Sequence, residues 1–293
     1  MKLDELRNKK VNRAISNEFN SAIAAIEETI RCANRNLKWL ENHGQAPIEK
    51  PNYLFSYTDP WSQGCYVLRY VYAYAYEYIN LYLQMISEYE LPDIVKVLSL
   101  GCGSMIDAWS LQEATKRNNL NPEVFYTGVD VVRWNKNYEP RTNDNVHKTM
   151  ILGKAGEFLA TQSELDFDIL IFPKSLGDIA KADRNDYKKI ITSLKNLKIK
   201  QERFIIAFSF IKYKDNNQSD SDFSDGIISC LSGKGYRFNK TSYVYSDEYI
   251  SSQEYPRIDT YLWDQTEILT GKKPISRRNY EKYYIYEFRK VNC

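Results

Sequence analysis

The sequence is poor in the residues that build disulfide frameworks and metal centres. Its five cysteines are scattered, and no two of them form a C-x-x-C pair, so we expect reduced thiols rather than disulfides. The two histidines, His43 and His147, share no metal-ligand spacing with each other or with a cysteine. We therefore expect no bound metal.

Long apolar runs and a strong net charge are missing as well. No apolar run approaches the roughly 18 residues of a membrane-spanning helix, and residues 1–6 lack the apolar segment of a signal peptide. The 40 basic and 38 acidic residues leave a net charge of only +2, so the overall charge of the protein does not indicate a polyanionic partner. We expect a cytoplasmic protein with no membrane partner, on which any nucleic-acid surface is local.

The chain divides near residue 92. Its 293 residues, 43% of them apolar, suffice for one large α/β domain, residues 92–293, with an appended N-terminal helical region, residues 1–91. Apolar side chains between residues 19 and 42 alternate steps of four and three, which predicts a long helix. Two interpretations of this helix stay open, namely packing onto its own domain and formation of a coiled-coil homodimer.

A tyrosine-rich stretch follows a helix start signal at Asp59 and Pro60. Five tyrosines recur every fourth residue, at Tyr66, Tyr70, Tyr74, Tyr78 and Tyr82, but residues 70–78 also alternate with the period of a strand. We favour a helix because the pattern continues beyond the length of one strand. The tyrosines then either pack this helix onto the domain or offer a stacking platform for bases.

Beyond residue 92 the pattern alternates between strands and helices. We predict strands at about 95–100, 124–130, 148–152, 167–172, 203–210, 236–245 and 282–290, with helices between them, among them helices near 185–197 and 221–231. The last two strands lack a convincing helix between them, which suggests an antiparallel pair. The expected fold is α/β, with a mostly parallel sheet and a ligand at the carboxyl ends of its strands.

A glycine turn closes the first of these strands. Residues 95–104 read VKVLSLGCGS, and the next predicted strand ends at Asp130. Glycines at Gly101 and Gly103 let the backbone approach a ligand closely, and an acidic side chain at the end of the next strand can hold a ribose diol. The pattern indicates a nucleoside-containing cofactor.

Three local matches make the chain resemble the class I S-adenosylmethionine-dependent methyltransferase superfamily. Residues 97–103 resemble the first motif of that family, residues 126–130 its second, and residues 231–238 the turn before its terminal hairpin. A looser match, residues 167–176, lies where the family places its fourth strand. The resemblance implies a Rossmann-like fold with seven strands and an antiparallel terminal hairpin, with S-adenosylmethionine as the cofactor.

The resemblance carries site residues with it. The residues expected to bind the cofactor are Leu100, Gly101, Cys102, Gly103, Ser104, Asp130, Val131, Gly156 and Glu157. Lys174 and Asp178 are the side chains expected to face the transferred methyl group, because they follow the fourth strand of the family. The alternative roles are a solvated lysine for Lys174, and for Asp178 the cap of a helix beginning near Ile179.

The sequence also departs from the family. Met105 stands where a third glycine is frequent, and residues 172–175 (FPKS) replace the motif of the enzymes that methylate exocyclic amino groups of DNA and RNA. Ile106 stands where a dinucleotide fingerprint requires glycine, which argues against a nicotinamide-dependent oxidoreductase. A non-catalytic module that binds the cofactor or another protein is the second alternative.

The acceptor is least defined by the sequence. The long connection between the last two strands, residues 246–279, is rich in aromatic side chains, and its segment 271–278 (GKKPISRR) is basic. This segment narrowly favours RNA or a nucleotide-containing acceptor over a protein or a small molecule. An ordinary solvated loop is the alternative.

Overall fold

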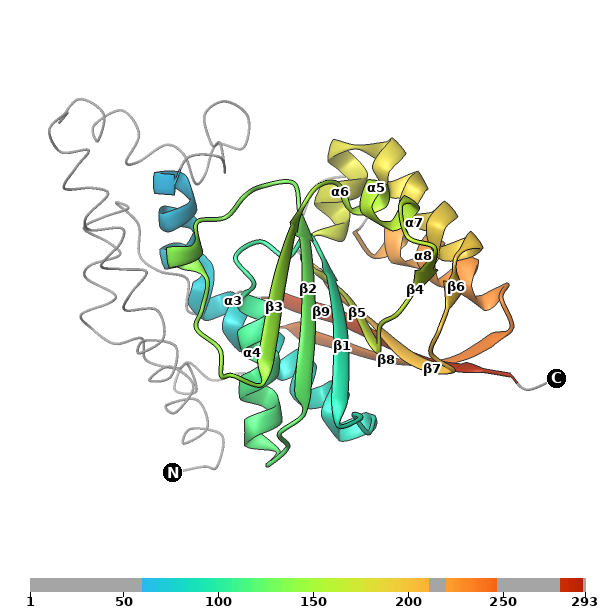
Figure 1. The fold of residues 1–293 in the computed structure, drawn as a ribbon, viewed down its shortest axis with the longest axis horizontal. Coiled ribbons are helices and arrows are strands. Elements are labelled where there is room, and N and C mark those ends of the chain that lie inside the picture. Colours follow the sequence, from blue (N-terminus) through green and yellow to red (C-terminus); the bar gives the residue numbers. More distant parts are fainter. Residues whose placement is uncertain (1–59, 211–219, 247–279, 292–293) are drawn as a thin grey trace, which may run out of the picture.

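The computed structural model describes residues 60–210, 220–246 and 280–291. In this part of the chain, seven strands form one sheet in the order β3-β2-β1-β5-β7-β9-β8 (Figure 1). The strands are β1 (Ile94–Leu100), β2 (Glu123–Asp130), β3 (Val146–Leu152), β5 (Ile169–Pro173), β7 (Arg203–Phe210), β8 (Tyr236–Ser246) and β9 (Tyr280–Lys290). Two short strands, β4 (Glu164–Leu165) and β6 (Lys198–Ile199), pair separately.

All seven predicted strands are confirmed, each within two residues of its expected ends. Strands β3, β2, β1, β5 and β7 pair in parallel, whereas β9 runs antiparallel to both β7 and β8. The terminal hairpin is therefore antiparallel, as expected, and β9 lies between β7 and β8. The chain order reverses between β1 and β5, so this pair marks the topological switch point of the sheet.

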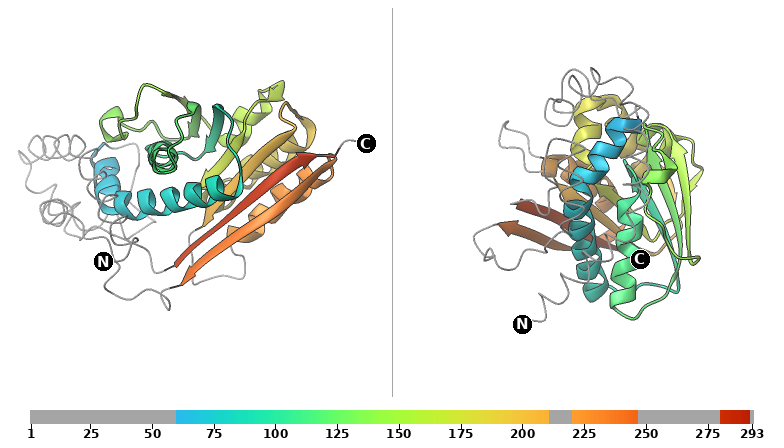
Figure 2. Two further views of the ribbon diagram at one scale, coloured as in Figure 1. Left: turned by 90° about the horizontal axis from the view of Figure 1, so that it is seen from below. Right: turned by 90° about the vertical axis from the view of Figure 1, so that its left-hand side faces the viewer.

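Helices cover the two faces of the sheet in separate groups. Two helices, α3 (Pro60–Glu88) and α4 (Ile106–Arg117), pack on one face, as Figure 2 shows. The other face carries α5 (Ala155–Ala160), α6 (Leu176–Ala182), α7 (Arg184–Asn196) and α8 (Asp220–Ser232). The positions of α7 and α8 confirm the helices that were predicted near 185–197 and 221–231.

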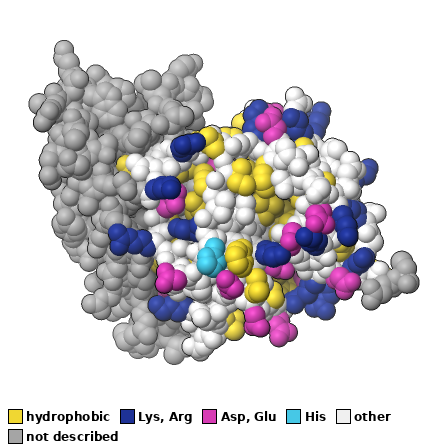
Figure 3. Space-filling model, viewed as in Figure 1, with side chains coloured by type: hydrophobic (Ala, Val, Ile, Leu, Met, Phe, Trp, Pro, Cys, Tyr) yellow, Lys and Arg dark blue, Asp and Glu magenta, His cyan; other side chains and the backbone are white. Residues whose placement is uncertain are grey.

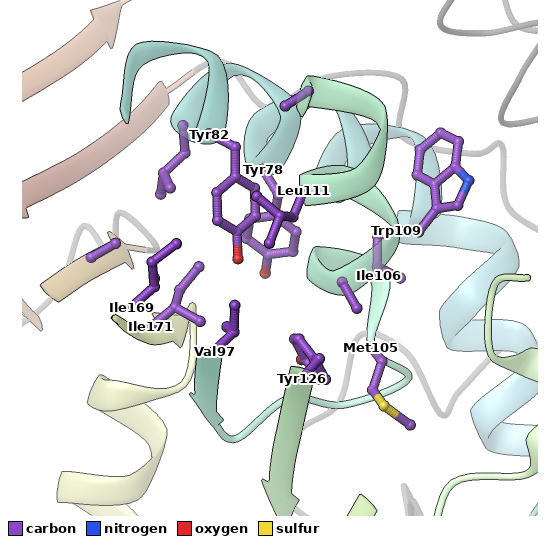
Figure 4. Close-up of a cluster of buried hydrophobic side chains, with 14 of the residues drawn as sticks. Tyr78, Tyr82, Val97, Met105, Ile106, Trp109, Leu111, Tyr126, Ile169 and Ile171 are labelled. Atoms are coloured by element: carbon purple, nitrogen blue, oxygen red, sulfur yellow. The ribbon is translucent and has the colours of Figure 1, made fainter. Parts of the chain in front are cut away.

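The tyrosine-rich stretch is helical, as predicted, and α3 begins at Pro60. Tyr74, Tyr78 and Tyr82 are buried against the sheet and α4, while Tyr66 and Tyr70 are half-buried. Figure 4 shows Tyr78 and Tyr82 extending from α3 toward the strands, with side chains of α4 beside them. Three of the five regularly spaced tyrosines therefore belong to the hydrophobic core.

The expectation of a helix after every strand is wrong between β2 and β3. The connection, residues 131–145, contains only a short 3₁₀ turn, η2 (Lys136–Tyr138). Its four asparagines and Pro140 are weak helix formers, which accounts for the difference. Instead of a helix, Trp134 and Tyr138 from this loop fill the core beneath α3 and α4.

The short helix α5 leaves part of one sheet face open. Phe125 on β2 is 43% exposed and stacks on His147 of β3, with ring centroids 4.9 Å apart. Figure 3 shows apolar side chains on this side of the molecule, lying between charged groups. His147 also contacts Glu123 at 3.1 Å, which gives this histidine an ordinary surface role.

Several expectations fall outside the described residues. These are the long helix at 19–42 with its possible homodimer contact, the cap Asp59, and the basic segment 271–278. Within the described ranges, no helix is long and apolar enough to cross a bilayer. The same ranges hold no group of three or more histidine, cysteine or acidic side chains placed to bind a metal ion.

Candidate functional site

The glycine turn, residues 101–103, lies directly at the carboxyl end of β1. Gly101 and Gly103 have φ angles of 75° and 54°, in the left-handed region that favours glycine. The backbone N–H of Gly101 donates to Val129 O at 2.7 Å, which ties the turn to β2. The turn therefore stands at the carboxyl edge of the sheet, where the sequence predicted a ligand.

Gly101 is also the point at which β1 meets the segment after β5. A Cβ on Gly101 would lie 2.3 Å from the Cβ of Ser175, and the Ser175 hydroxyl donates to Leu100 O. No side chain at position 101 fits in that space. The contact brings the glycine turn and the segment that holds Lys174 to the same switch point.

Met105 adopts the backbone conformation that a third glycine would have at this position. Its φ of 58° is the left-handed conformation that glycine adopts at no steric cost. The Met105 side chain is 2% exposed and joins the core below α4, near Ile106 (Figure 4). Burial of this apolar side chain offsets the backbone strain.

Asp130 is joined directly to the glycine turn. One carboxylate oxygen accepts from the Gly103 N–H at 2.8 Å, and the other accepts from the Val132 N–H at 2.8 Å. Burial raises the pKa of Asp130, while these backbone donors act in the opposite direction. The predicted turn and the predicted acid thus form one site.

The other predicted cofactor residues fall into two groups. Leu100, Cys102, Ser104 and Val131 adjoin the turn or Asp130, and Ser104 is 3% exposed, with no hydrogen-bond partner for its hydroxyl among the described residues. Gly156 and Glu157 instead contact α7. The Gly156 N–H donates to Asp186 at 3.0 Å, and Glu157 pairs with Lys189 at 3.3 Å.

Cys102 is held in an unreactive setting. Its thiol lies 3.5 Å from the sulfur of Met150 and fills the space beside Gly128, where a Cβ would approach it to 2.6 Å. Burial first, and then the charges of Asp130 and Asp107, raise the pKa of this thiol well above its usual value. Cys102 therefore packs the turn and is not a nucleophile.

Lys174 follows β5 immediately and lies deep in the fold. Its φ of 56° is left-handed, and its ammonium group forms an ion pair with Glu77 of α3. The ammonium group also lies 5.3 Å from the centre of the Tyr74 ring. Glu77, which is fully buried, accepts a second bond from the Ser209 hydroxyl at the end of β7.

Asp178 differs from Lys174 in its surroundings. It is exposed on the first turn of α6, which begins at Leu176 rather than near Ile179. The alternative role of Asp178 as a helix cap is therefore wrong, and so is that of Lys174 as a solvated side chain, because Lys174 is 7% exposed. Of the two, only Lys174 is built into the carboxyl edge.

A second buried acid, Asp107, lies behind the glycine turn. Its carboxylate accepts from the Tyr126 hydroxyl at 2.8 Å and from the Ser99 hydroxyl at 2.9 Å. Burial raises the pKa of Asp107 from 3.8 to about 6, although these two donors lower it. Burial raises the pKa of Tyr82 of α3, and the nearby charge of Asp107 raises it further.

We expect this acid to make stability depend on pH. Because the folded-state pKa of Asp107 is raised, its carboxyl favours folding most below pH 4, and about 3 kcal/mol is lost as the pH rises from about 4 to 6. In Asp107→Asn this loss should be absent. Urea unfolding between pH 4 and 7 measures the difference between variant and wild type, with exposed Asp144→Asn as the control. A difference that does not change with pH would contradict the assignment.

Sequence reasoning did not find four buried polar residues of this region. They are Gln63, Glu77, Asp107 and Ser209, and each contacts a residue of another element. Glu77 and Asp107 carry a weak signal, since each is an acid on the apolar face of a helix. Gln63 and Ser209 carry none, because their partners lie far away in the sequence.

Of the comparisons with known proteins, only the one with solved structures gives matches. The sequence matches no protein-family model, and no curated protein matches it. Among solved structures, the chain is similar to precorrin-6y C5,15-methyltransferase of Geobacter metallireducens GS-15, with 15% identity over 72% of this chain and 88% of that one and a TM-score of 0.39.

Two further solved structures are similar to this chain. Loganic acid methyltransferase with SAH matches at 10% identity over 84% of this chain and 99% of that one, with a TM-score of 0.36. The [4+2]-cyclase SpnF matches at 11% identity over 89% and 93%, with a TM-score of 0.38. At these identities the fold assignment rests on the strand order of the chain itself. With β9 antiparallel between β7 and β8, this chain has the Rossmann-like fold, with seven strands and an antiparallel terminal hairpin, that was expected from its sequence.

Proposed function

We propose that the protein binds S-adenosylmethionine at the glycine turn and transfers its methyl group to an acceptor. The observation that carries the proposal is the bond between the Gly103 N–H and Asp130, which unites turn and acid at the switch point of the sheet. The lack of a partner for the buried Ser104 hydroxyl among the described residues supports it, because a bound ligand would satisfy that group.

The residues present suit this cofactor in their chemistry. The glycine turn is half-buried at Gly101 and Gly103, so part of its backbone stays accessible to a ligand, and Asp130 keeps lone pairs that can accept from ribose hydroxyls. When bound, S-adenosylmethionine supplies a methyl group already activated by a sulfonium cation. The protein then has to position the acceptor and exclude water, which requires no catalytic triad.

Lys174 and Asp178 are the proposed groups on the acceptor side. Lys174 directly precedes Ser175, which touches the glycine turn, so the backbone of Lys174 lies at the switch point. Because Glu77 neutralises Lys174, we assign to this lysine the orientation of neighbouring groups rather than proton transfer. Asp178 is the exposed candidate for accepting a proton.

RNA or a nucleotide-containing molecule is the acceptor that we propose to test first. Its support is the basic segment 271–278 and the aromatic content of its surroundings in the sequence. Labelled methyl transfer into RNA, protein and metabolite fractions of a cell extract identifies the class. No incorporation into any fraction, together with tight cofactor binding, would favour a non-catalytic cofactor-binding module.

Calorimetric titration tests cofactor binding. We expect S-adenosylmethionine and S-adenosylhomocysteine to bind and NAD not to bind. Asp130→Ala should weaken S-adenosylhomocysteine about tenfold to a hundredfold, because one or two charge-assisted hydrogen bonds are lost. Exposed Asp144→Ala should leave the affinity unchanged, and thermal unfolding of each variant confirms that it folds. Failure of the wild type to bind either sulfur compound would refute the proposal.

A further inference from the structure

Trp134 lies beside both parts of the proposed cofactor site. It belongs to the loop that replaces a helix between β2 and β3, and it is 7% exposed. A Cβ on Gly103 would lie 3.8 Å from Cζ2 of the indole, which is ordinary van der Waals contact. The indole therefore covers the side of the turn toward which a side chain at position 103 would point.

The indole also lies near Asp130. The Trp134 side chain is among the groups that oppose the burial-induced rise in the pKa of this carboxyl. One aromatic ring thus lies beside both Gly103 and the acid that Gly103 holds. Because Asp130 and Gly103 are the groups expected to contact the cofactor, the ring stands at the ribose end of the site.

Gln63 of α3 holds the backbone on both sides of Trp134. Its Nε2 donates to Arg133 O at 2.9 Å, and its Oε1 accepts from the Asn135 N–H at 2.8 Å. Gln63 is 1% exposed, so these bonds are shielded from water. Tyr66, one turn further along α3, packs on the indole with ring centroids 5.7 Å apart.

We propose that Trp134 forms a wall of the cofactor site and that Gln63 positions it through the backbone at Arg133 and Asn135. The inference rests on the proposed function and adds to it a contact residue and its support. An indole held in place before binding offers to an adenosine the apolar part of the ring that lies over Gly103. Little ordering entropy then remains to be lost on binding.

Titrations with S-adenosylhomocysteine, followed by calorimetry and tryptophan fluorescence, test the inference. Trp134→Ala should weaken binding about tenfold, as expected for the loss of one aromatic contact. Trp134→Phe should keep the affinity within about threefold, because a ring remains. The change in fluorescence that the ligand causes in the wild type should vanish in Trp134→Phe but persist in Trp109→Phe, which replaces a tryptophan of α4 instead.

The role of Gln63 is tested separately with Gln63→Leu. This variant should weaken binding about threefold to tenfold and shift the emission of the ligand-free protein to longer wavelength, since two backbone hydrogen bonds that hold the loop are lost. Gln84→Leu, the same substitution on the same helix, is the matched control and should change neither quantity.

The possible results separate the two proposals. If the wild type binds and Trp134→Ala binds equally well or more tightly, the wall is refuted and cofactor binding stands. If Gln63→Leu matches the wild type in both affinity and emission, its positioning role is refuted. If the wild type does not bind S-adenosylhomocysteine, the proposed function fails, and the inference fails with it.

Discussion

Gly101→Ala is expected to destabilise the protein by about 2 to 5 kcal/mol, the sum of left-handed backbone strain and overpacking. The new methyl group would lie 2.3 Å from the Cβ of Ser175, an atom that cannot move without displacing the segment after β5. Gly103→Ala is the matched control. Its φ of 54° is similarly strained, but the nearest atom to its Cβ is 3.8 Å away, so strain of about 1 to 2 kcal/mol is the main cost.

Urea unfolding of the two variants measures this contrast. Because both substitutions add one methyl group to the same turn, the difference between them isolates the clash with Ser175. Ser175→Gly should recover part of the loss in Gly101→Ala, since it removes the atom that the new methyl group meets. Equal stability of the two alanine variants would mean that the segment after β5 does not lie against Gly101.

Removal of either partner of the Glu77–Lys174 pair is expected to cost about 3 to 5 kcal/mol, because the remaining charge stays buried. The side chains of Glu77 and Lys174 are 0% and 3% exposed, so water cannot solvate the remaining charge. Lys174→Met keeps the backbone strain at this position, since methionine tolerates a positive φ no better than lysine does. The loss then reports the charge alone.

The double variant Glu77→Leu with Lys174→Met distinguishes a buried pair from simple packing. It should regain most of the stability lost in either single variant, because no unpaired charge remains. Lys154→Met removes a lysine from an exposed pair with Asp183 and should cost far less stability than removal of either buried partner. Chemical unfolding of all four variants gives the coupling energy, and additive losses in the double variant would contradict the ion pair.

The strands were predictable from the sequence because their signal is local. Residues 204–208 form a continuous apolar run, and β7 (Arg203–Phe210) contains it. The turn at Gly101 and the acid at Asp130 were predictable for a related reason, since strand ends in a parallel sheet meet at one edge. Both observations depend only on neighbouring residues and on the general rules of parallel sheets.

The contacts that complete the site were not predictable in this way. Gln63 reaches Asn135, and Glu77 reaches Lys174, across long stretches of chain that only the packing of α3 on the sheet brings together. The helix predicted between β2 and β3 is not present. The prediction followed the usual alternation of strand and helix, but the residues of this connection are weak helix formers. Met105 likewise adopts a glycine-like backbone because its side chain gains burial, which spacing does not reveal.

The position of β9 also constrains the order in which the protein folds. Strand β9 follows β8 in the sequence but lies between β7 and β8, so neither strand has its final neighbour on that side until β9 is in place. During synthesis the ribosome releases β7 and β8 first, and both then carry unpaired N–H and C=O groups. The nascent chain therefore passes through a stage with an open apolar edge on β7, and at this stage aggregation competes with folding.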